Sequence, residues 1–145
     1  MPETNLQTLL ATMSPILEPE TYVYVTDSDD GERLNRKDLL FFFREKESGT
    51  LVIPEARAIS LGLDSTFRCR MITLNVHSSL SAVGFLAAIL ERLKHHGVPA
   101  NPVAAFHHDH LFVPADRAEE ALLVLRALSK ESVEGKSEET LSEPD

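Results

Sequence analysis

The fold is decided by residues 71–113, which read MITLNVHSSLSAVGFLAAILERLKHHGVPANPVAAFHHDHLFV. An apolar strand pattern runs into a His-Ser-Ser turn and then into a segment whose apolar residues recur at spacings of three and four, as on one face of a helix. Gly97 is placed to end that helix, since glycine accepts the left-handed backbone there. Two short apolar runs flank HHDH (residues 107–110) and predict an antiparallel hairpin. This stretch therefore predicts the order β-α-β-β.

The segments on either side complete the pattern. Pro114 to Leu128 carries the apolar stripe of a further helix, and a last strand would give βαββαβ, the ferredoxin-like order. No apolar run follows residue 130, so we expect the strand TYVYVTD (residues 21–27) to fill the missing edge. The fold class predicted is α+β, with ferredoxin-like (βαββαβ-type) units in tandem. Their antiparallel sheet has helices packed on one face.

The first half predicts shorter elements. A helix is expected over residues 4–13, then the strand 21–27 and a polar loop over residues 28–38. Residues 39–43 fit a strand or a helix, and Asp38 as a cap with Gly49 as a terminator favours a helix over residues 39–47. A strand over 50–54 and a helical turn ending near Gly62 follow. In the second half, Ser79 or Ser81 is expected to cap the long helix.

Composition limits the function classes. The chain has 145 residues and a formal net charge of −9, which argues against nucleic acid as a partner. Its single cysteine, Cys69, excludes an intrachain disulfide and fits a buried inert thiol. No apolar run approaches the roughly 20 residues of a membrane span. The sequence thus predicts a soluble cytoplasmic protein that does not bind membranes.

Three stretches resemble the ACT-domain superfamily of small regulatory modules: FFFREKESGTLVIPEARAISLGL, ITLNVHSSLSAVGF and AAFHHDHLFVPADRAEEAL. More narrowly, they resemble uncharacterised stand-alone proteins made of two ACT-like units. On this resemblance, residues 1–65 form a first, divergent unit and residues 66–129 form the second. Residues 130–145 hold two lysines and six acidic residues and are expected to be a disordered acidic tail.

The resemblance also implies a ligand site. ACT modules bind amino acids or similar small molecules where a strand-to-helix turn meets a neighbouring strand, and they pair side by side through their sheets. Carried onto this chain, the turn supplies the ligand-binding residues Asn75, Val76, His77, Ser78, Ser79 and Leu80, and the facing strand begins at Asn101. From the HHDH cluster we add His108, Asp109 and His110 as residues that could contribute to the same pocket. The free N–H groups of a helix N-terminus, with serine hydroxyls nearby, suit a carboxylate.

The HHDH cluster has other interpretations. Histidines two residues apart on a strand point to the same side, so His108 and His110 could share a metal with His77 or Asp109 as a third ligand. A cluster that shapes the turn is the simpler interpretation. We therefore expect no metal site, no cofactor and no catalytic residue.

The predicted function is a non-catalytic sensor that binds a small molecule, with an amino acid as the first candidate. The expected partners are that ligand and, through sheet edges, a second copy or another protein. One alternative is a protein-interaction or assembly module with no ligand. A weaker alternative is a metal-dependent enzyme that uses the HHDH cluster.

Overall fold

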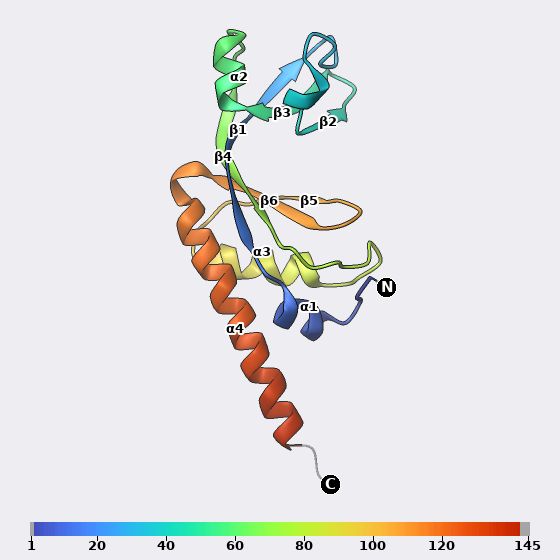
Figure 1. The fold of residues 1–145 in the computed structure, drawn as a ribbon, viewed down its shortest axis with the longest axis vertical. Coiled ribbons are helices and arrows are strands. Elements are labelled where there is room, and N and C mark those ends of the chain that lie inside the picture. Colours follow the sequence, from blue (N-terminus) through green and yellow to red (C-terminus); the bar gives the residue numbers. More distant parts are fainter. Residues whose placement is uncertain (1, 143–145) are drawn as a thin grey trace. The chain divides into compact units, whose positions relative to one another are not determined.

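A computed structural model describes the backbone of residues 2–142 and the side chains of residues 2–135 (Figure 1). Along the chain the elements are α1 (Leu6–Thr12), β1 (Ile16–Asp27), η1 (Arg36–Asp38), β2 (Phe41–Arg44), β3 (Gly49–Pro54), α2 (Glu55–Ser60), β4 (Thr66–Thr73), α3 (Phe85–His95), β5 (Asn101–Ala104), β6 (Asp109–Pro114), η2 (Ala115–Arg117) and α4 (Ala118–Ser142). Here η denotes a short 3₁₀ helix.

The strands belong to one six-stranded sheet in the order β2-β3-β1-β4-β6-β5. By their internal contacts the residues form two compact units: unit 1 joins the chain up to Glu18 to the chain from Met71 onward, and unit 2 is Pro19–Arg70. The long strands β1 and β4 each pass through both units. The predicted α+β fold of ferredoxin-like units with an antiparallel sheet is confirmed.

The N-terminal residues belong to unit 1 although the sequence places them in the first half. β1 lies beside β4 in the sheet, and the Thr73 hydroxyl on β4 donates to the Glu18 carboxylate on β1 at 3.0 Å. Residues 16–18 at the start of β1 therefore take the position that the second half of the chain lacks. The expectation that TYVYVTD (residues 21–27) takes it is corrected, because this stretch belongs to unit 2 and pairs with β3. The expected boundary at residue 65 divides the chain where its sequence pattern repeats. In space, by contrast, the residues up to Glu18 belong to unit 1 with the second half of the chain.

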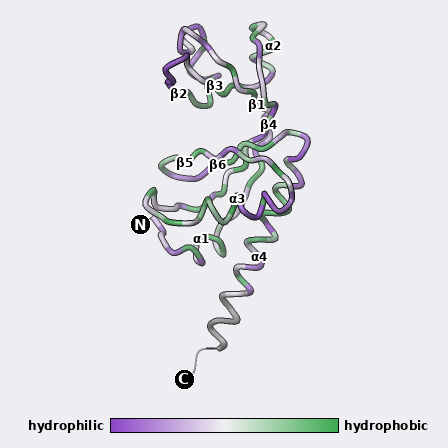
Figure 2. Tube along the Cα trace, turned by 180° about the vertical axis from the view of Figure 1, so that it is seen from behind, coloured by the Kyte–Doolittle hydropathy of each residue, from purple (hydrophilic) through white to green (hydrophobic). Residues whose placement is uncertain are grey.

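Unit 1 holds the larger core, where α1, α3 and α4 pack against β4 and β6. Green, apolar segments of the tube run along these elements in Figure 2. Helix α3 faces this core with Phe85, Ile89 and Leu93, spaced four residues apart and at most 3% exposed. Gly97, at φ 66°, then takes the left-handed position that was predicted to end the helix.

Unit 2 has a smaller core beneath the antiparallel pair β1 and β3. In this ladder Val23 lies opposite Ile53 and Val25 lies opposite Leu51, and all four side chains are buried. Ala58 of α2 closes the cluster. The expected helical turn with Gly62 after it is confirmed, since α2 ends at Ser60 and Gly62 has a φ of 65°.

The two units repeat one hairpin-and-helix pattern at an interval of 60 residues. Strands β3 and β6 show the same alternation of buried and half-buried positions, and each is the second strand of an antiparallel hairpin. The residues common to both copies are Leu51 and Leu111, Pro54 and Pro114, Arg57 and Arg117, and Ala58 and Ala118. The repeat relates positions in one unit to positions in the other.

The helix predicted over residues 39–47 is wrong. Phe41 to Arg44 form the strand β2, and Phe42 lies opposite Leu51 of β3. Asp38 does not cap a helix; it belongs to the short 3₁₀ turn and pairs with Arg57, with 3.1 Å between Oδ2 and Nε. Pairing with a neighbouring strand, a tertiary effect, decides the conformation of this ambiguous apolar run.

Helix α4 continues to Ser142, which differs from the disorder expected from residue 130. The first turns of α4 beyond the core bind side chains of α1 and α3. The Gln7 amide donates to the Ser132 backbone oxygen at 2.7 Å, and Arg92 binds the Glu131 carboxylate through two nitrogens at 3.0 and 2.8 Å. These contacts favour a helix where composition alone indicates none. Residues 143–145 of the expected tail lie outside the described residues.

Candidate functional site

The connection between β4 and α3 builds the candidate site. β4 ends at Thr73 and α3 begins at Phe85, so the connection is longer than the sequence predicts. Gly84 is the N-cap of α3, with a φ of 92° and no side-chain cap. The prediction that Ser79 or Ser81 caps this helix is wrong, because the Ser79 hydroxyl accepts from the Ser81 N–H within the connection at 3.0 Å. The N-terminus of α3 is thus uncapped by any side chain.

A pocket of about 140 Å³ opens at this helix end. Its wall is formed by Ser78, Ser79, Leu80, Ala82, Gly84, Phe85, Leu86, Ala87, Ala104 and Asp109. Four of these are predicted site residues: Ser78, Ser79, Leu80 and Asp109. The sequence prediction missed Ala82, Gly84, the first turn of α3 and Ala104. Ala104 could have been found from the hairpin register, where it lies opposite Asp109.

Asp109 is the charged group of this pocket. It is 5% exposed, and its carboxylate oxygen Oδ2 accepts from the Ser78 hydroxyl at 2.8 Å. Its backbone oxygen accepts from the Leu74 N–H at 3.0 Å, which fixes the start of β6 against the end of β4. Among the described residues, Ser78 is the one side chain that donates to this carboxylate. Since Asp109 also lines the pocket, a ligand would meet a negative charge that has little access to water.

The N-terminal segment holds the pocket loop in place. The Glu3 N–H donates to the His77 oxygen, and the Ser79 N–H donates to the Glu3 oxygen, both at 2.9 Å. These bonds form a parallel bridge between Glu3 and Ser78. The backbone around Ser78 is therefore fixed from outside the loop, which places the hydroxyl against Asp109.

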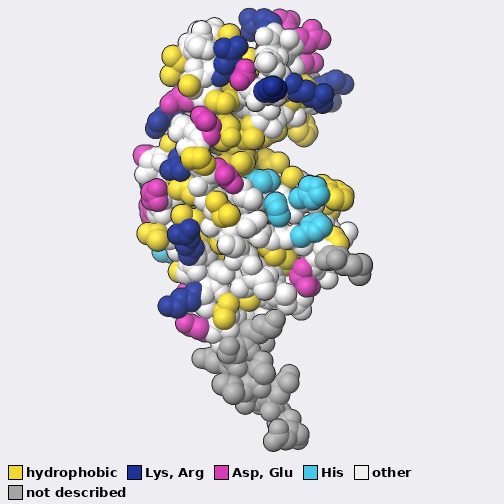
Figure 3. Space-filling model, in the orientation of Figure 1, with side chains coloured by type: hydrophobic (Ala, Val, Ile, Leu, Met, Phe, Trp, Pro, Cys, Tyr) yellow, Lys and Arg dark blue, Asp and Glu magenta, His cyan; other side chains and the backbone are white. Residues whose placement is uncertain are grey.

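Histidine side chains gather on one face of the molecule (Figure 3), and the ring contacts assign them to unit 1. His77, His107, His108 and His110 follow one another in a row, with ring centroids 6.1, 6.5 and 6.5 Å apart. The exposed Phe106 ring lies against His107, at a centroid distance of 5.0 Å. Within the described part of the chain, no three His, Cys, Asp or Glu residues converge where they could hold a metal.

His108 and His110 are each tied to the scaffold through Nδ1. His108 Nδ1 lies 3.4 Å from the Val76 oxygen, and His110 Nδ1 lies 3.1 Å from the Thr73 hydroxyl. Burial lowers the pKa of His110, and the neighbouring His108 lowers it further. Both rings thus hold the backbone around the turn, and neither is among the residues that line the pocket.

The remaining predicted residues lie away from the pocket wall. Asn75, with a φ of 52°, turns the chain out of the sheet, and Val76 offers its oxygen to His108. Asn101 begins the strand β5, as predicted, but it lies opposite Phe112 at the other end of the hairpin from Ala104. None of the helices in the described residues has the length and apolar character that crossing a bilayer requires.

Comparison with known proteins identifies the family. Residues 1–70 and residues 66–127 each match a family model of the ACT domain. No curated protein matches the chain.

Among solved structures, the chain is similar to VC0802 from Vibrio cholerae, a protein of unknown function described as a possible transport protein. The identity is 38%, the match covers 86% of this chain and 95% of that one, and the TM-score is 0.76. Protein Atu0741 from Agrobacterium tumefaciens shares the fold at 15% identity, with 81% and 89% of the two chains covered and a TM-score of 0.66. The regulatory subunit of aspartate kinase from Thermus thermophilus shares it at 11% identity, 82% and 97% coverage and a TM-score of 0.56.

The resemblance seen in the sequence is therefore confirmed over both halves of the chain. Two ACT-domain matches in tandem, together with a relative of 38% identity, show that this chain belongs to the ACT-domain family.

Proposed function

We propose that this protein is a non-catalytic regulatory protein of the ACT type that binds a small molecule, an amino acid first, in the pocket of unit 1. One observation carries the proposal: the carboxylate of Asp109, 5% exposed, lines a pocket that opens at the uncapped N-terminus of α3. Hydrogen bonds stabilise a buried carboxylate, and the ammonium group of a ligand would add a donor to the one that the Ser78 hydroxyl provides.

The pocket offers complementary groups to a zwitterion. The first turn of α3 has N–H groups without partners inside the helix and a partial positive charge, which favour a carboxylate. Asp109 favours an ammonium group, with a charge-assisted hydrogen bond that is stronger than a neutral one. Leu80, Leu86 and Ala104 supply an apolar wall for a short side chain.

The size of the pocket favours a small ligand. At roughly 30 Å³ for each water in the liquid, 140 Å³ corresponds to four or five waters, the scale of alanine or serine. Pockets for drug-sized ligands usually span about 300–1,000 Å³. We therefore expect small amino acids to bind before aromatic or basic ones.

The reactive side chains support a role without catalysis. The Ser78 hydroxyl donates to Asp109, so it is held as an anchor and has no histidine as a base. Cys69 lies in unit 2, is buried, and has a pKa that burial raises to about 12. A thiol of that pKa is a poor nucleophile at neutral pH.

A thermal-shift screen against the twenty amino acids tests the proposal. A ligand at about 100 times its Kd stabilises the folded state by about 2.7 kcal/mol, which raises Tm by several degrees. Asp109→Asn should abolish the shift, whereas Asp116→Asn, the same charge change at an exposed position outside the pocket, should retain it. No shift with any amino acid would contradict the proposed ligand class, and an equal shift in Asp109→Asn would contradict the proposed site.

Assembly through sheet edges is the second candidate. β2 is a terminal strand of the sheet, and its Phe43 side chain is 65% exposed. An exposed strand edge with an apolar side chain can pair with another chain. Light scattering of the wild type and of Phe43→Lys tests this, and a monomer at every concentration would rule it out.

A further inference from the structure

We propose that the ligand site of unit 1 has no counterpart at the matching hairpin position of unit 2, because side chains of unit 2 fill that position. This inference rests on the pocket proposed for unit 1 and adds that the equivalent hairpin position is closed in unit 2. It follows from the repeat that relates the two hairpins.

Gly49 of unit 2 corresponds to Asp109 of unit 1. Each begins the second strand of its hairpin, and each lies opposite the last residue of the first strand: Arg44 for Gly49, and Ala104 for Asp109. Both positions are buried. The carboxylate that serves the pocket of unit 1 is thus absent from this position in unit 2.

The space at Gly49 is already occupied. A Cβ atom there would lie 2.6 Å from Cε2 of Phe42 and 2.8 Å from Oδ1 of Asp30. Real Cβ atoms do not approach other atoms this closely, so no side chain fits beside Gly49 unless its neighbours move. The Phe42 ring is half-buried and packs on the core of unit 2. Phe42 and Asp30 together fill the volume where the side chain of Asp109 begins in unit 1.

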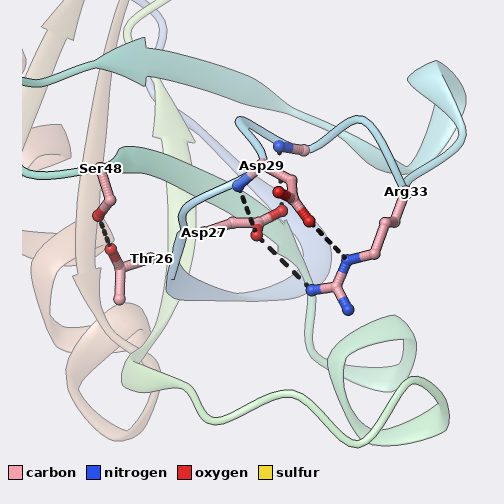
Figure 4. A network of polar contacts seen from close by, with 6 residues as sticks. Thr26, Asp27, Asp29, Arg33 and Ser48 are labelled. Carbon is pink, nitrogen blue, oxygen red and sulfur yellow. Dashed lines mark hydrogen bonds and ion pairs between the residues drawn. The ribbon is translucent and has the colours of Figure 1, made fainter.

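The connection after β1 also binds a carboxylate of its own chain. Asp27, 7% exposed, accepts from the Asp29 N–H through Oδ1 at 3.1 Å and from the Gly31 N–H through Oδ2 at 3.0 Å (Figure 4). The Arg33 guanidinium lies 3.6 Å from Oδ1 of Asp27. In unit 1, by contrast, no side chain caps the N–H groups at the start of α3. The carboxylate at this connection of unit 2 is therefore bound by N–H groups of its own chain, whereas the start of α3 in unit 1 has no carboxylate of its own chain as a cap.

Isothermal titration with L-alanine and L-serine as probes measures the number of sites. We expect one site per chain in the wild type, no binding in Asp109→Asn, and one site of unchanged affinity in Asp27→Asn. Two sites, or binding in Asp109→Asn that is lost when Asp27→Asn is added, would overturn the inference.

A second measurement needs no ligand. Gly49→Ala should lower Tm by several degrees because the added methyl group meets Phe42 and Asp30, and Asp30→Gly with Phe42→Leu should restore much of the loss in the triple variant. Gly135→Ala in α4 is the control: the nearest atom to its Cβ would be 3.9 Å away, so we expect no loss. A Gly49→Ala variant as stable as the wild type would show that the space is open and overturn the inference.

The two measurements separate the proposals. If neither probe binds but Gly49→Ala is destabilised, the pocket proposed in unit 1 fails while the closed state of unit 2 stands. If one probe binds at two sites, the pocket stands and the inference about unit 2 fails.

Discussion

Ser78→Ala tests the anchoring of the pocket carboxylate. The substitution removes one hydroxyl, whose hydrogen bond to Asp109 is 2.8 Å long. Both residues are at least nine-tenths buried, at 8% and 5% exposure, and both line the pocket. The backbone bonds of Glu3 to the loop do not involve the hydroxyl and remain. The change therefore isolates one hydrogen bond to a buried charge.

The expected loss follows from the kind of bond. Hydrogen bonds to charged groups contribute about 1.5–3 kcal/mol to the free energy of unfolding. Asp109 also lines the pocket, where water can replace part of the lost bond, so we expect the lower end, about 1.5 kcal/mol. For a chain of this size that corresponds to a fall in Tm of roughly 3–6 °C.

Urea unfolding followed by far-UV circular dichroism is the suitable assay, because the chain has no tryptophan. Ser79→Ala is the matched control: its hydroxyl accepts from the exposed Ser81 N–H, and we expect the free energy of unfolding to fall by less than about 0.5 kcal/mol. If both variants lower the free energy of unfolding equally, and its dependence on urea concentration is unchanged, the assignment of Ser78 as the anchor of Asp109 is refuted.

Three further predictions test the core, the end of α3 and the histidine row. Leu93→Ala, at a fully buried position, should lower the free energy of unfolding by about 2–5 kcal/mol in urea unfolding, whereas Leu123→Ala, 65% exposed, should change it little. Gly97→Ala should lower the free energy of unfolding by about 1–2 kcal/mol because of the positive φ alone, since no atom lies within 4 Å of the added Cβ. An unchanged Tm in calorimetry would argue against the left-handed backbone at Gly97. Burial lowers the pKa of His110 in the folded state, so the unfolded chain binds a proton at this histidine at a higher pH than the folded chain does. The contribution of His110 to the free energy of unfolding is therefore complete above pH 6.5 and decreases as the pH falls below it. His110→Asn should reduce the decline in urea midpoint between about pH 7 and about pH 5.5, and an unchanged decline would contradict this.

The local pattern of the chain predicted much of unit 1. The spacing of Phe85, Ile89 and Leu93 predicted the buried face of α3, and Gly97 predicted its end, because both signals depend on residues a few positions apart. The apolar runs around HHDH predicted the hairpin β5–β6 for the same reason. The family resemblance added Ser78, Ser79 and Leu80, and the HHDH cluster added Asp109; the structure brings these four residues to one pocket.

Other features depend on residues far apart in the sequence. Phe41 to Arg44 could be helix or strand until β3 pairs with them, and Gln7 and Arg92 extend order along α4 beyond the core. The first turn of α3 lines the pocket, and Gly84, rather than a serine, precedes the helix.

The sequence by itself determined the α+β class, the ACT family and the main elements of unit 1, since hydrophobic period and turn chemistry act over short distances. Tertiary structure alone decided that residues up to Glu18 join unit 1 and that the buried Asp109 faces a pocket while Gly49 faces filled space. The physical reason is that burial, packing and the environment of a charge depend on which distant segments approach a residue, and local sequence does not encode that approach.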